Sequence, residues 1–320
     1  MQKRGHTVKV IGPSDFHFSF AMPGYPEIKL VMFPYSRLKK YIKEFAPDHI
    51  HLAAEGPLGW AGRKYCIKNN VEYTSTYHTH FPDYVSKRVC WFLPFLSNFS
   101  YRMTVRYVRT FHAKAQSIMV ATQSLESQLK QWFFKPPLYR LSRGVDLSVF
   151  YPGPATLFKD LTKPVALYVG RVAVEKNIEA FLEMPWEGTK VIVGDGPMLS
   201  TLEQRYPEAI FVSKKIGEEL ADHYRSADVF VFPSRTDTFG IVIIEALACG
   251  TPVAGFNVPG PKDILTRDFL GGMDEKDLAA ATQKALKNGN RERCTEFIKE
   301  NYTWETAAAQ FEAAITEEKT

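Results

Sequence analysis

Short runs rich in β-branched and aromatic residues alternate with longer stretches of helical periodicity along most of the chain. Apolar runs of this length, separated by helices, are typical of buried strands in a parallel sheet. The predicted strands are 7–11, 28–32, 49–53, 72–77, 117–121, 166–169, 190–193, 210–212, 228–232 and 252–256. The predicted helices include 37–45, 125–132, 218–226 and 241–248. Residues 276–316 are predicted to form successive helices with no further strand.

The alternation breaks once, in the segment 146–163, which is rich in Pro, Gly and polar residues. At about 150 residues per domain, a chain of 320 residues is expected to form two domains. We therefore predict an α/β fold with two doubly wound, Rossmann-like domains, residues 1–150 and 151–320, facing a cleft at the carboxyl ends of their sheets. The chain begins at what reads as a helix-to-strand junction, so the first domain is expected to lack its first βα unit, roughly 25 residues.

Composition excludes several classes of protein. With 45% hydrophobic and 23% charged residues, the chain is neither disordered nor fibrous. Apolar stretches end well before the ~18 residues that a membrane span needs, and the N-terminus has no apolar signal core. The four cysteines are far apart, which argues against a disulfide framework or structural zinc and favours a reducing, cytoplasmic location. A net charge of +5 is too small to suggest a nucleic-acid-binding protein first.

The densest chemical signal is the block 234–254, in which a buried strand ends in Pro-Ser and a helix begins near Gly240. Free N–H groups and the positive dipole end of that helix would suit a diphosphate, and glycine would let the ligand approach the backbone closely. Asp237 precedes the helix and Glu245 lies in its first turns, so both can face the ligand. The alternative is that Asp237 caps the helix and Glu245 is a solvated surface residue.

A second signal follows the predicted strand 166–169, where Arg171 and Lys176 lie in the loop to the next helix. Two cations at this position can neutralise a leaving pyrophosphate. The alternative is a solvated basic loop in which the cations pair with Glu175. The turn Gly-Asp-Gly-Pro at 194–197 is by itself a weak, structural signal.

Together these motifs resemble the retaining glycosyltransferases of family four, which have the GT-B fold. The resemblance covers nearly the whole chain: Gly-Arg-x-x-x-x-Lys-Asn at 170–177, Gly-Asp-Gly-Pro at 194–197, Ala-Asp-Val-Phe-Val-Phe-Pro-Ser at 227–234, the block Thr-Phe-Gly…Glu-Ala-Leu-Ala-x-Gly-x-Pro-Val, and the linker 143–152. Thr-Asp-Thr-Phe-Gly, Val-Pro-Gly-Pro and Glu-Gly-Pro-Leu-Gly at 55–59 look most like the branch with α-mannosyltransferases and sulfoquinovosyl transferases.

The resemblance implies a role for each matching position. Arg171 and Lys176 would bind the donor diphosphate with the backbone amides of Phe239 and Gly240, and Glu245 would hold the ribose. Asp237 would contact the donor sugar, although the family usually has Glu there and aspartate is one methylene shorter. Ser213 stands where the family often has Gly near the base, so the donor can be a UDP- or a GDP-sugar.

In the first domain, His78 follows a predicted strand and matches the family's active-site histidine, expected near the transferred sugar. His80 is the second candidate, and a purely structural histidine is the alternative. Neither a metal nor another cofactor is expected: no His/Asp/Glu cluster has metal-ligand spacing, and cations and helix N-termini can stabilise the leaving diphosphate.

The two halves of the chain differ strongly in charge. Residues 1–150 hold 21 Lys and Arg against 9 Asp and Glu, a net charge of +12, and the remainder carries −7. The segment 87–109 interleaves aromatic residues with arginines, a composition suited to the surface of an anionic bilayer. The alternative is that the aromatics pack in the core while the arginines are merely solvated.

These observations predict a glycosyltransferase that moves a hexose, with mannose as the candidate sugar, from a nucleotide sugar to a lipid or lipid-linked (glycan) acceptor with retention. It would be cytoplasmic, peripheral on the inner membrane face, with no nucleic-acid partner. The rival prediction is a non-catalytic, N-terminally truncated GT-B protein that only binds the nucleotide sugar. A nucleotide-binding oxidoreductase is weaker, because no Gly-x-Gly-x-x-Gly follows a strand. A glycosidase would need a protonated carboxylic acid, which the cationic loop disfavours.

Overall fold

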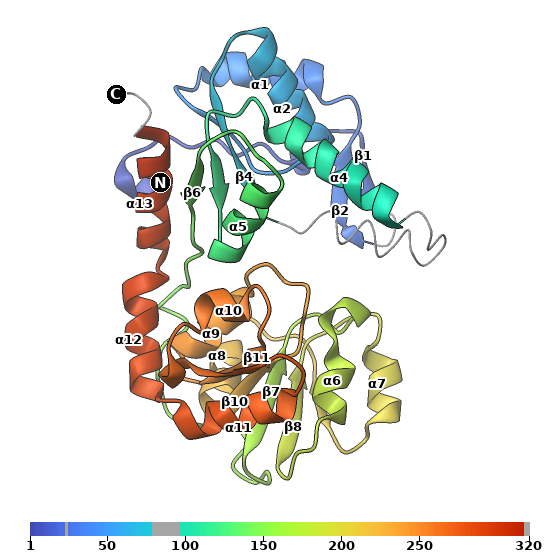
Figure 1. The fold of residues 1–320 in the computed structure, drawn as a ribbon, viewed down its shortest axis with the longest axis vertical. Helices are drawn as coiled ribbons and strands as arrows, with labels where there is room; N and C mark the ends of the chain where they lie inside the picture. Colours follow the sequence, from blue (N-terminus) through green and yellow to red (C-terminus); the bar gives the residue numbers. More distant parts are fainter. Residues whose placement is uncertain (23–24, 79–96, 317–320) are drawn as a thin grey trace. The chain divides into compact units, whose positions relative to one another are not determined.

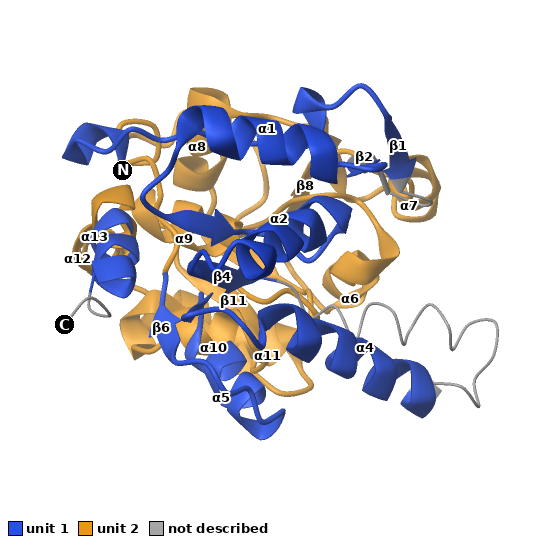
Figure 2. Ribbon diagram, turned by 90° about the horizontal axis from the view of Figure 1, so that it is seen from above, with its two compact units in different colours: residues 1–141, 308–320 blue, residues 142–307 orange. Residues whose placement is uncertain are grey.

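The computed structural model describes residues 1–22, 25–78 and 97–316 (Figure 1). The chain forms two compact units, which are described separately (Figure 2). Unit 1 consists of Met1–Leu141 and Ala308–Thr320, and unit 2 of Ser142–Ala307. The predicted boundary after residue 150 lies nine residues beyond the end of the first segment of unit 1, and residues 308–320, predicted for the second domain, belong to unit 1.

Unit 1 is built on a four-stranded parallel sheet whose strands follow chain order, β3-β4-β5-β6. Its strands are β3 (Ile50–Leu52), β4 (Tyr73–Tyr77), β5 (Ile118–Val120) and β6 (Leu138–Arg140). Its helices are α1 (Tyr35–Phe45), α2 (Pro57–Lys68), α4 (Ser97–His112) and α5 (Gln123–Gln131), with short 3₁₀ turns at Gln2–Arg4 and Pro13–Asp15. β4 and β5 are buried throughout, because helices cover both faces of the sheet.

Of two predicted strands at the start of the chain, one is wrong and the other is confirmed as a strand but not as part of the parallel sheet. Residues 7–11 form no strand: Val8 and Val10 are exposed, and no neighbouring strand pairs with this segment in the described part of unit 1. The predicted strand 28–32 is real but belongs to an antiparallel hairpin, β1 (Ser19–Met22) with β2 (Tyr25–Val31), outside the parallel sheet. Residues 7–11 therefore have the alternating apolar pattern of a strand, but no described strand pairs with them. A strand needs such a neighbour to be stable.

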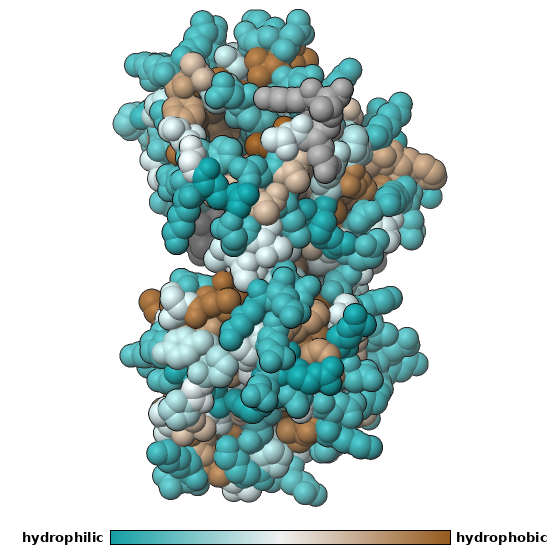
Figure 3. All heavy atoms as spheres, turned by 90° about the vertical axis from the view of Figure 1, so that its left-hand side faces the viewer, coloured by the Kyte–Doolittle hydropathy of each residue, from teal (hydrophilic) through white to brown (hydrophobic). Residues whose placement is uncertain are grey.

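The last helix, α13 (Trp304–Thr316), ends in unit 1. Glu312 forms ion pairs with Arg4 and with His6, and hydrogen bonds from His6 and then Arg4 hold the pKa of Glu312 below its usual range. The ring of Phe311 packs edge-on against His51, with 5.0 Å between ring centroids. The face of the molecule seen in Figure 3 is mostly hydrophilic, with apolar residues in small separate groups.

Unit 2 has six parallel strands in the order β12-β11-β10-β7-β8-β9. The strands are β7 (Val165–Val169), β8 (Thr189–Val193), β9 (Ile210–Val212), β10 (Val229–Phe232), β11 (Val253–Phe256) and β12 (Gly271–Asp274). The helices are α6 (Ile178–Glu183), α7 (Leu199–Arg205), α8 (Gly217–Ser226), α9 (Ile241–Ala248), α10 (Pro261–Ile264), α11 (Leu278–Asn288) and α12 (Arg291–Asn301), with 3₁₀ turns at Val174–Lys176 and Asp268–Leu270. β7 and β10 are wholly buried, which explains their unbroken apolar sequences.

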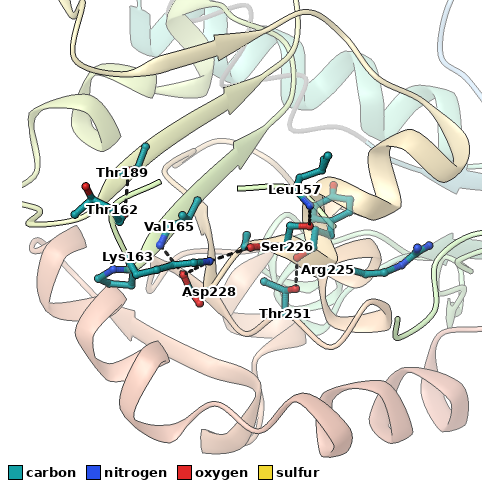
Figure 4. A network of polar contacts seen from close by, with 12 residues as sticks. Leu157, Thr162, Lys163, Val165, Thr189, Arg225, Ser226, Asp228 and Thr251 are labelled. Carbon is teal, nitrogen blue, oxygen red and sulfur yellow. Dashed lines mark hydrogen bonds and ion pairs between the residues drawn. The ribbon is translucent and has the colours of Figure 1, made fainter. Parts of the chain in front are cut away.

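Polar contacts fix the segment that leads into β7 (Figure 4). Asp228 Oδ2 accepts a 2.6 Å hydrogen bond from the Val165 amide and lies 3.1 Å from Lys163 Nζ. Ser226 Oγ accepts from the Leu157 amide at 3.0 Å. The irregular segment before β7 is therefore held against the turn between α8 and β10.

Candidate functional site

The strand order of unit 2 reverses between β7 and β10. These strands are neighbours, with Val229 opposite Ala166, but the chain leaves β7 toward β8 on one side and β10 toward β11 on the other. The loops at the carboxyl ends of β7 and β10 therefore diverge, and open α/β sheets bind ligands in the resulting crevice.

A cavity of about 280 Å³ opens at this point of the sheet edge. Four residues that the sequence predicted for the site line it together: Arg171, Lys176, Asp237 and Gly240. Helix α9 begins here as predicted, with Gly240 at its N-cap position and Ile241 in the lining. The sequence motifs after two different strands thus meet in one anion-compatible site.

Lys176 and Asp237 form an ion pair across the cavity, with Nζ 2.7 Å and 2.9 Å from the two carboxylate oxygens. Each side chain keeps about a quarter of its surface exposed. The Asn177 side-chain amide donates to the Pro233 carbonyl at 3.0 Å, and the Thr236 hydroxyl donates to the Glu175 carbonyl at 3.3 Å. These bonds fasten the loop after β7 to the loop after β10.

One alternative raised by the sequence is wrong: Asp237 does not cap α9, because the N-cap is Gly240 and makes no side-chain capping bond. The alternative of a basic loop that pairs with Glu175 is wrong for Lys176, which pairs with Asp237. For Arg171 it stays untested.

Glu245 lies on α9 in a partly buried position, and its Oε2 accepts a 3.0 Å hydrogen bond from the hydroxyl of Tyr224 on α8. Burial raises the pKa of the Glu245 carboxyl, and the Tyr224 hydrogen bond opposes the rise. Tyr224 is fully buried, and that burial and the Glu245 charge raise the pKa of its phenol well above the usual value. Glu245 is therefore held by a partner that the sequence did not reveal, since Tyr224 lies on another helix and in no motif.

Phe239 and Gly240 bear on the site through their backbones. The Phe239 ring is buried and packs against Tyr302, with ring centroids 5.9 Å apart, so it does not reach into the site. Gly240 has φ +84°, and a Cβ there would lie 3.0 Å from both Ile243 and Phe232 side chains. The expected role of both residues, which rests on their amides, stays a prediction.

In unit 1, His78 directly follows β4 and is partly buried. The second candidate, His80, lies outside the described residues, so its placement stays untested. Thr74, Thr76 and His78 alternate along β4 and its end, which places them on one side of the sheet. The role of His78 near the sugar stays a prediction.

A row of polar groups that the sequence analysis missed runs along this side of β3 and β4. His51 bridges two threonines, with Nδ1 2.8 Å from Thr74 Oγ1 and Nε2 2.6 Å from Thr76 Oγ1. His49 Nε2 also lies 2.8 Å from Thr74 Oγ1. The alternation of His49 with His51 and of Thr74 with Thr76 is the sequence signal that could have revealed it.

Neutral His51 should make the stability of the chain depend on pH. Burial, and then the nearby His49, His78 and His112, lower the pKa of His51 from 6.5 to about 3. Between these values the unfolded chain binds the extra proton, so this contribution to stability is complete above pH 6.5 and is lost as the pH falls toward 3. We expect His51→Asn, which does not titrate, to reduce the loss of unfolding free energy between pH 7 and pH 5 by about 2 kcal/mol. Urea unfolding at both values measures it; identical pH slopes for the two proteins would contradict it.

The opposite side of β4 carries a second buried polar chain. Ser75 Oγ lies 2.8 Å from Nδ1 of His112, and Nε2 of His112 lies 3.2 Å from Glu55 Oε1. His112 is completely buried at the end of α4. Glu55, the first residue of the Glu-Gly-Pro-Leu-Gly motif, therefore helps to fix α4 against the sheet.

Across 1–22, 25–78 and 97–316, no three His, Cys, Asp or Glu side chains cluster as ligands of a metal ion would. In the same ranges, no helix combines the length and the apolar character needed to cross a bilayer.

Comparison with known proteins supports the family resemblance that the sequence motifs indicated. Residues 1–149 match the family model "Glycosyltransferase Family 4", and residues 154–304 match "Glycosyl transferases group 1". The chain is 32% identical over 250 residues to a GDP-mannose-dependent alpha-mannosyltransferase of Mycobacterium tuberculosis, covering 74% of this chain and 63% of the relative. It is 29% identical to sulfoquinovosyl transferase SQD2 of Arabidopsis thaliana, over 79% of this chain and 51% of that protein. An alpha-monoglucosyldiacylglycerol synthase of Streptococcus pneumoniae is 25% identical, over 89% of this chain and 72% of the relative.

Among solved structures, sucrose-phosphate synthase from Thermosynechococcus elongatus matches with a TM-score of 0.70 at 24% identity, over 88% of this chain and 76% of that one. This likeness confirms the predicted GT-B fold. The chain spans 63% and 51% of the lengths of the mycobacterial and plant relatives. The two family models nevertheless account for nearly all of it, and the chain belongs to the glycosyltransferases that join a family 4 domain, here residues 1–149, to a group 1 domain, here residues 154–304.

Proposed function

We propose that this chain transfers a hexosyl group, mannosyl being the first candidate, from a nucleoside diphosphate sugar to a lipid or lipid-linked acceptor with retention of configuration. The observation that carries the proposal is the cavity at the strand-order reversal of unit 2, which gathers Arg171, Lys176 and the start of α9. The relatives support the donor and acceptor classes, since one is named GDP-mannose-dependent and another a diacylglycerol glucoside synthase.

Each of the candidate residues has a role in the proposed reaction. Arg171 and Lys176 bind the diphosphate together with the first amides of α9, and they stabilise its charge as it leaves. An ammonium group has three donors, so Lys176 can hold both Asp237 and a phosphate oxygen. Asp237 accepts hydrogen bonds from sugar hydroxyls. Glu245, which lies on α9 but outside the lining of the cavity, accepts them from the ribose.

The proposed step is a front-face displacement. The bond from the anomeric carbon to the phosphate oxygen breaks while the acceptor oxygen forms a bond on the same side of the sugar. The leaving phosphate oxygen takes the acceptor proton. His78 contributes by contact with the transferred sugar. The proposal includes no metal or other cofactor, because cations, amides and positioning supply the catalysis.

The test is a screen of UDP- and GDP-sugars for binding and hydrolysis, with wild type and Glu245→Ala. We expect one donor to be turned over by wild type, and the variant to bind it about 10- to 100-fold more weakly, because a charged acceptor of hydrogen bonds is lost. Gln128→Ala, a change on α5 of unit 1, is the control and should leave donor binding unchanged. Donor binding without hydrolysis of any donor would favour the non-catalytic alternative, and no binding at all would refute both.

A further inference from the structure

Helix α4 of unit 1 has two distinct faces. Thr104, Val108 and Phe111 are buried against the unit. Arg102, Arg106 and Arg109 are exposed, and their spacing of four and three residues aligns them in one stripe along the helix. The exposed side is therefore strongly cationic.

Large apolar side chains lie beside this arginine stripe. Phe99 and Met103 are 64% and 50% exposed, and with Tyr107 they form a second stripe at a spacing of four residues. A soluble helix normally places such residues against its core. Here the core side of α4 is already filled by other residues.

The arginine stripe forms one wall of a cavity of about 880 Å³ between α4 and the corner that joins α5 to β6. Five of its lining residues are cationic and none is acidic: Arg102, Arg106, Arg109, Lys114 and Lys135. The opposite wall is Trp132, Phe133 and Phe134. Phe133 is 76% exposed and has φ +56°, a left-handed conformation that is uncommon for a bulky residue.

His78 does not line this basic–aromatic cavity. α4 ends at His112 just before β5, and the corner 132–136 directly precedes β6, so this part of the cavity lies toward the amino ends of these strands. Its aromatic wall also contacts the last residue of β4, because the ring of Trp132 lies 6.2 Å from the ring of Tyr77, the residue before His78.

We propose that this face docks on the surface of a bilayer that contains anionic phospholipids. The five cations bind lipid phosphates, while Phe133 on one side and Phe99 and Met103 on the other enter the boundary between headgroups and acyl chains. The exposed apolar stripe favours a bilayer over a water-soluble polyanion, which would leave these side chains in water. The inference deepens the proposed function, on which it rests, because it brings the enzyme to the surface that holds a lipid acceptor.

The sequence-based prediction placed the membrane segment at 87–109, and its part 87–96 lies outside the described residues. In the described part of that segment, Phe99 and Tyr107 are exposed and Tyr101 is partly buried, so the alternative that the aromatics pack in the core is wrong for Phe99 and Tyr107. The α5–β6 corner, which contributes Phe133 and Lys135, was not part of the prediction.

The test is co-sedimentation of the full chain with vesicles of neutral phosphatidylcholine and with vesicles that contain about 30% phosphatidylglycerol. We expect binding to the anionic vesicles only, weakened by salt. Arg102→Gln/Arg106→Gln should lower the partition coefficient about tenfold or more, since each cation near an anionic surface contributes about fivefold. Phe133→Asn, which tolerates the left-handed backbone, should also weaken binding several-fold.

Lys39→Gln/Lys43→Gln, on exposed positions of α1, removes the same charge from the same unit and should bind like wild type. Equal loss in this control, equal binding to both kinds of vesicle, no binding, or preferential binding of RNA over anionic vesicles would overturn the proposal. Donor hydrolysis is measured on the same samples without vesicles. An active enzyme that ignores vesicles refutes only the docking surface, and vesicle binding without donor binding refutes only the proposed function.

Discussion

Replacement of Lys176 by Met should lower the rate of donor turnover about 10²- to 10³-fold, the usual effect of removing one preorganised group that stabilises a leaving charge. The Lys176 ammonium lies in the cavity at the strand-order reversal, beside Arg171 and the start of α9. Charge develops on the diphosphate as the glycosidic bond breaks, so the loss should fall mainly on kcat. Steady-state kinetics with the donor found in the screen measure it.

Lys176 also neutralises Asp237, so the single variant leaves a carboxylate without its ion pair. The double variant Lys176→Met/Asp237→Asn removes both charges and separates the two effects. If Lys176 acts on the diphosphate, the double variant is much slower than Asp237→Asn alone; if Lys176 only neutralises Asp237, the double variant is no slower than Asp237→Asn. Lys176→Arg, which keeps the charge, should retain more activity than Lys176→Met, and an unchanged kcat in the Met variant would contradict the assigned role.

The sheet of unit 2 was largely predictable because both of its faces are covered. Strands such as β7 and β10 are then buried on both sides and appear in the sequence as unbroken apolar runs. β12 was missed because it opens with Gly271 and Gly272, which give no strand signal. Gly271 is required there: its φ is +150° and a Cβ would lie 1.8 Å from the Val253 carbonyl oxygen.

The sheet of unit 1 was harder to predict because its strands are short. β6 has three residues, all partly exposed, and follows two prolines, so neither burial nor length marks it. Residues 7–11 show the opposite failure, since they have the alternation of a strand but pair with no strand in the part of the chain that the structure describes. Pairing is a property of the tertiary structure, and a local pattern does not contain it.

The candidate site was predictable as far as it depends on sequence-local motifs. Arg171, Lys176, Asp237 and Gly240 lie in loops after strands, and the topology rule that joins such loops at one edge explains why these four residues line one cavity. Tyr224 beside Glu245, and His51 between two threonines, are contacts between distant segments, and no motif contains them. The cavity beside α4 was half predictable for the same reason, since Phe133 and Lys135 come from another part of the chain.

Replacement of Gly194 by Ala should destabilise unit 2 by about 2–6 kcal/mol, through backbone strain and overpacking together. Gly194 has φ +154°, and a Cβ there would lie 1.9 Å from the carbonyl oxygen of Gly170, a backbone atom that no rotamer change can move. Gly170 directly precedes Arg171, so any backbone shift that relieves the clash also displaces the diphosphate-binding loop. The Gly-Asp-Gly-Pro turn, a weak signal in the sequence alone, therefore has a physical explanation. Glycine at position 194 lets the loop after β8 lie against the loop after β7.

The variant Gly217→Ala is the control for Gly194→Ala, because it adds backbone strain without a clash such as the one with Gly170. Gly217 has φ +59°, and nothing lies within 4 Å of the position of its added Cβ, so only the strain of a left-handed alanine remains, about 1–2 kcal/mol. Urea unfolding should therefore show a clearly larger loss for Gly194→Ala, together with weaker donor binding that Gly217→Ala lacks. Equal losses in the two variants would mean that the contact with Gly170 relaxes at no cost, and the close packing of the two loops would then not be what requires glycine at position 194.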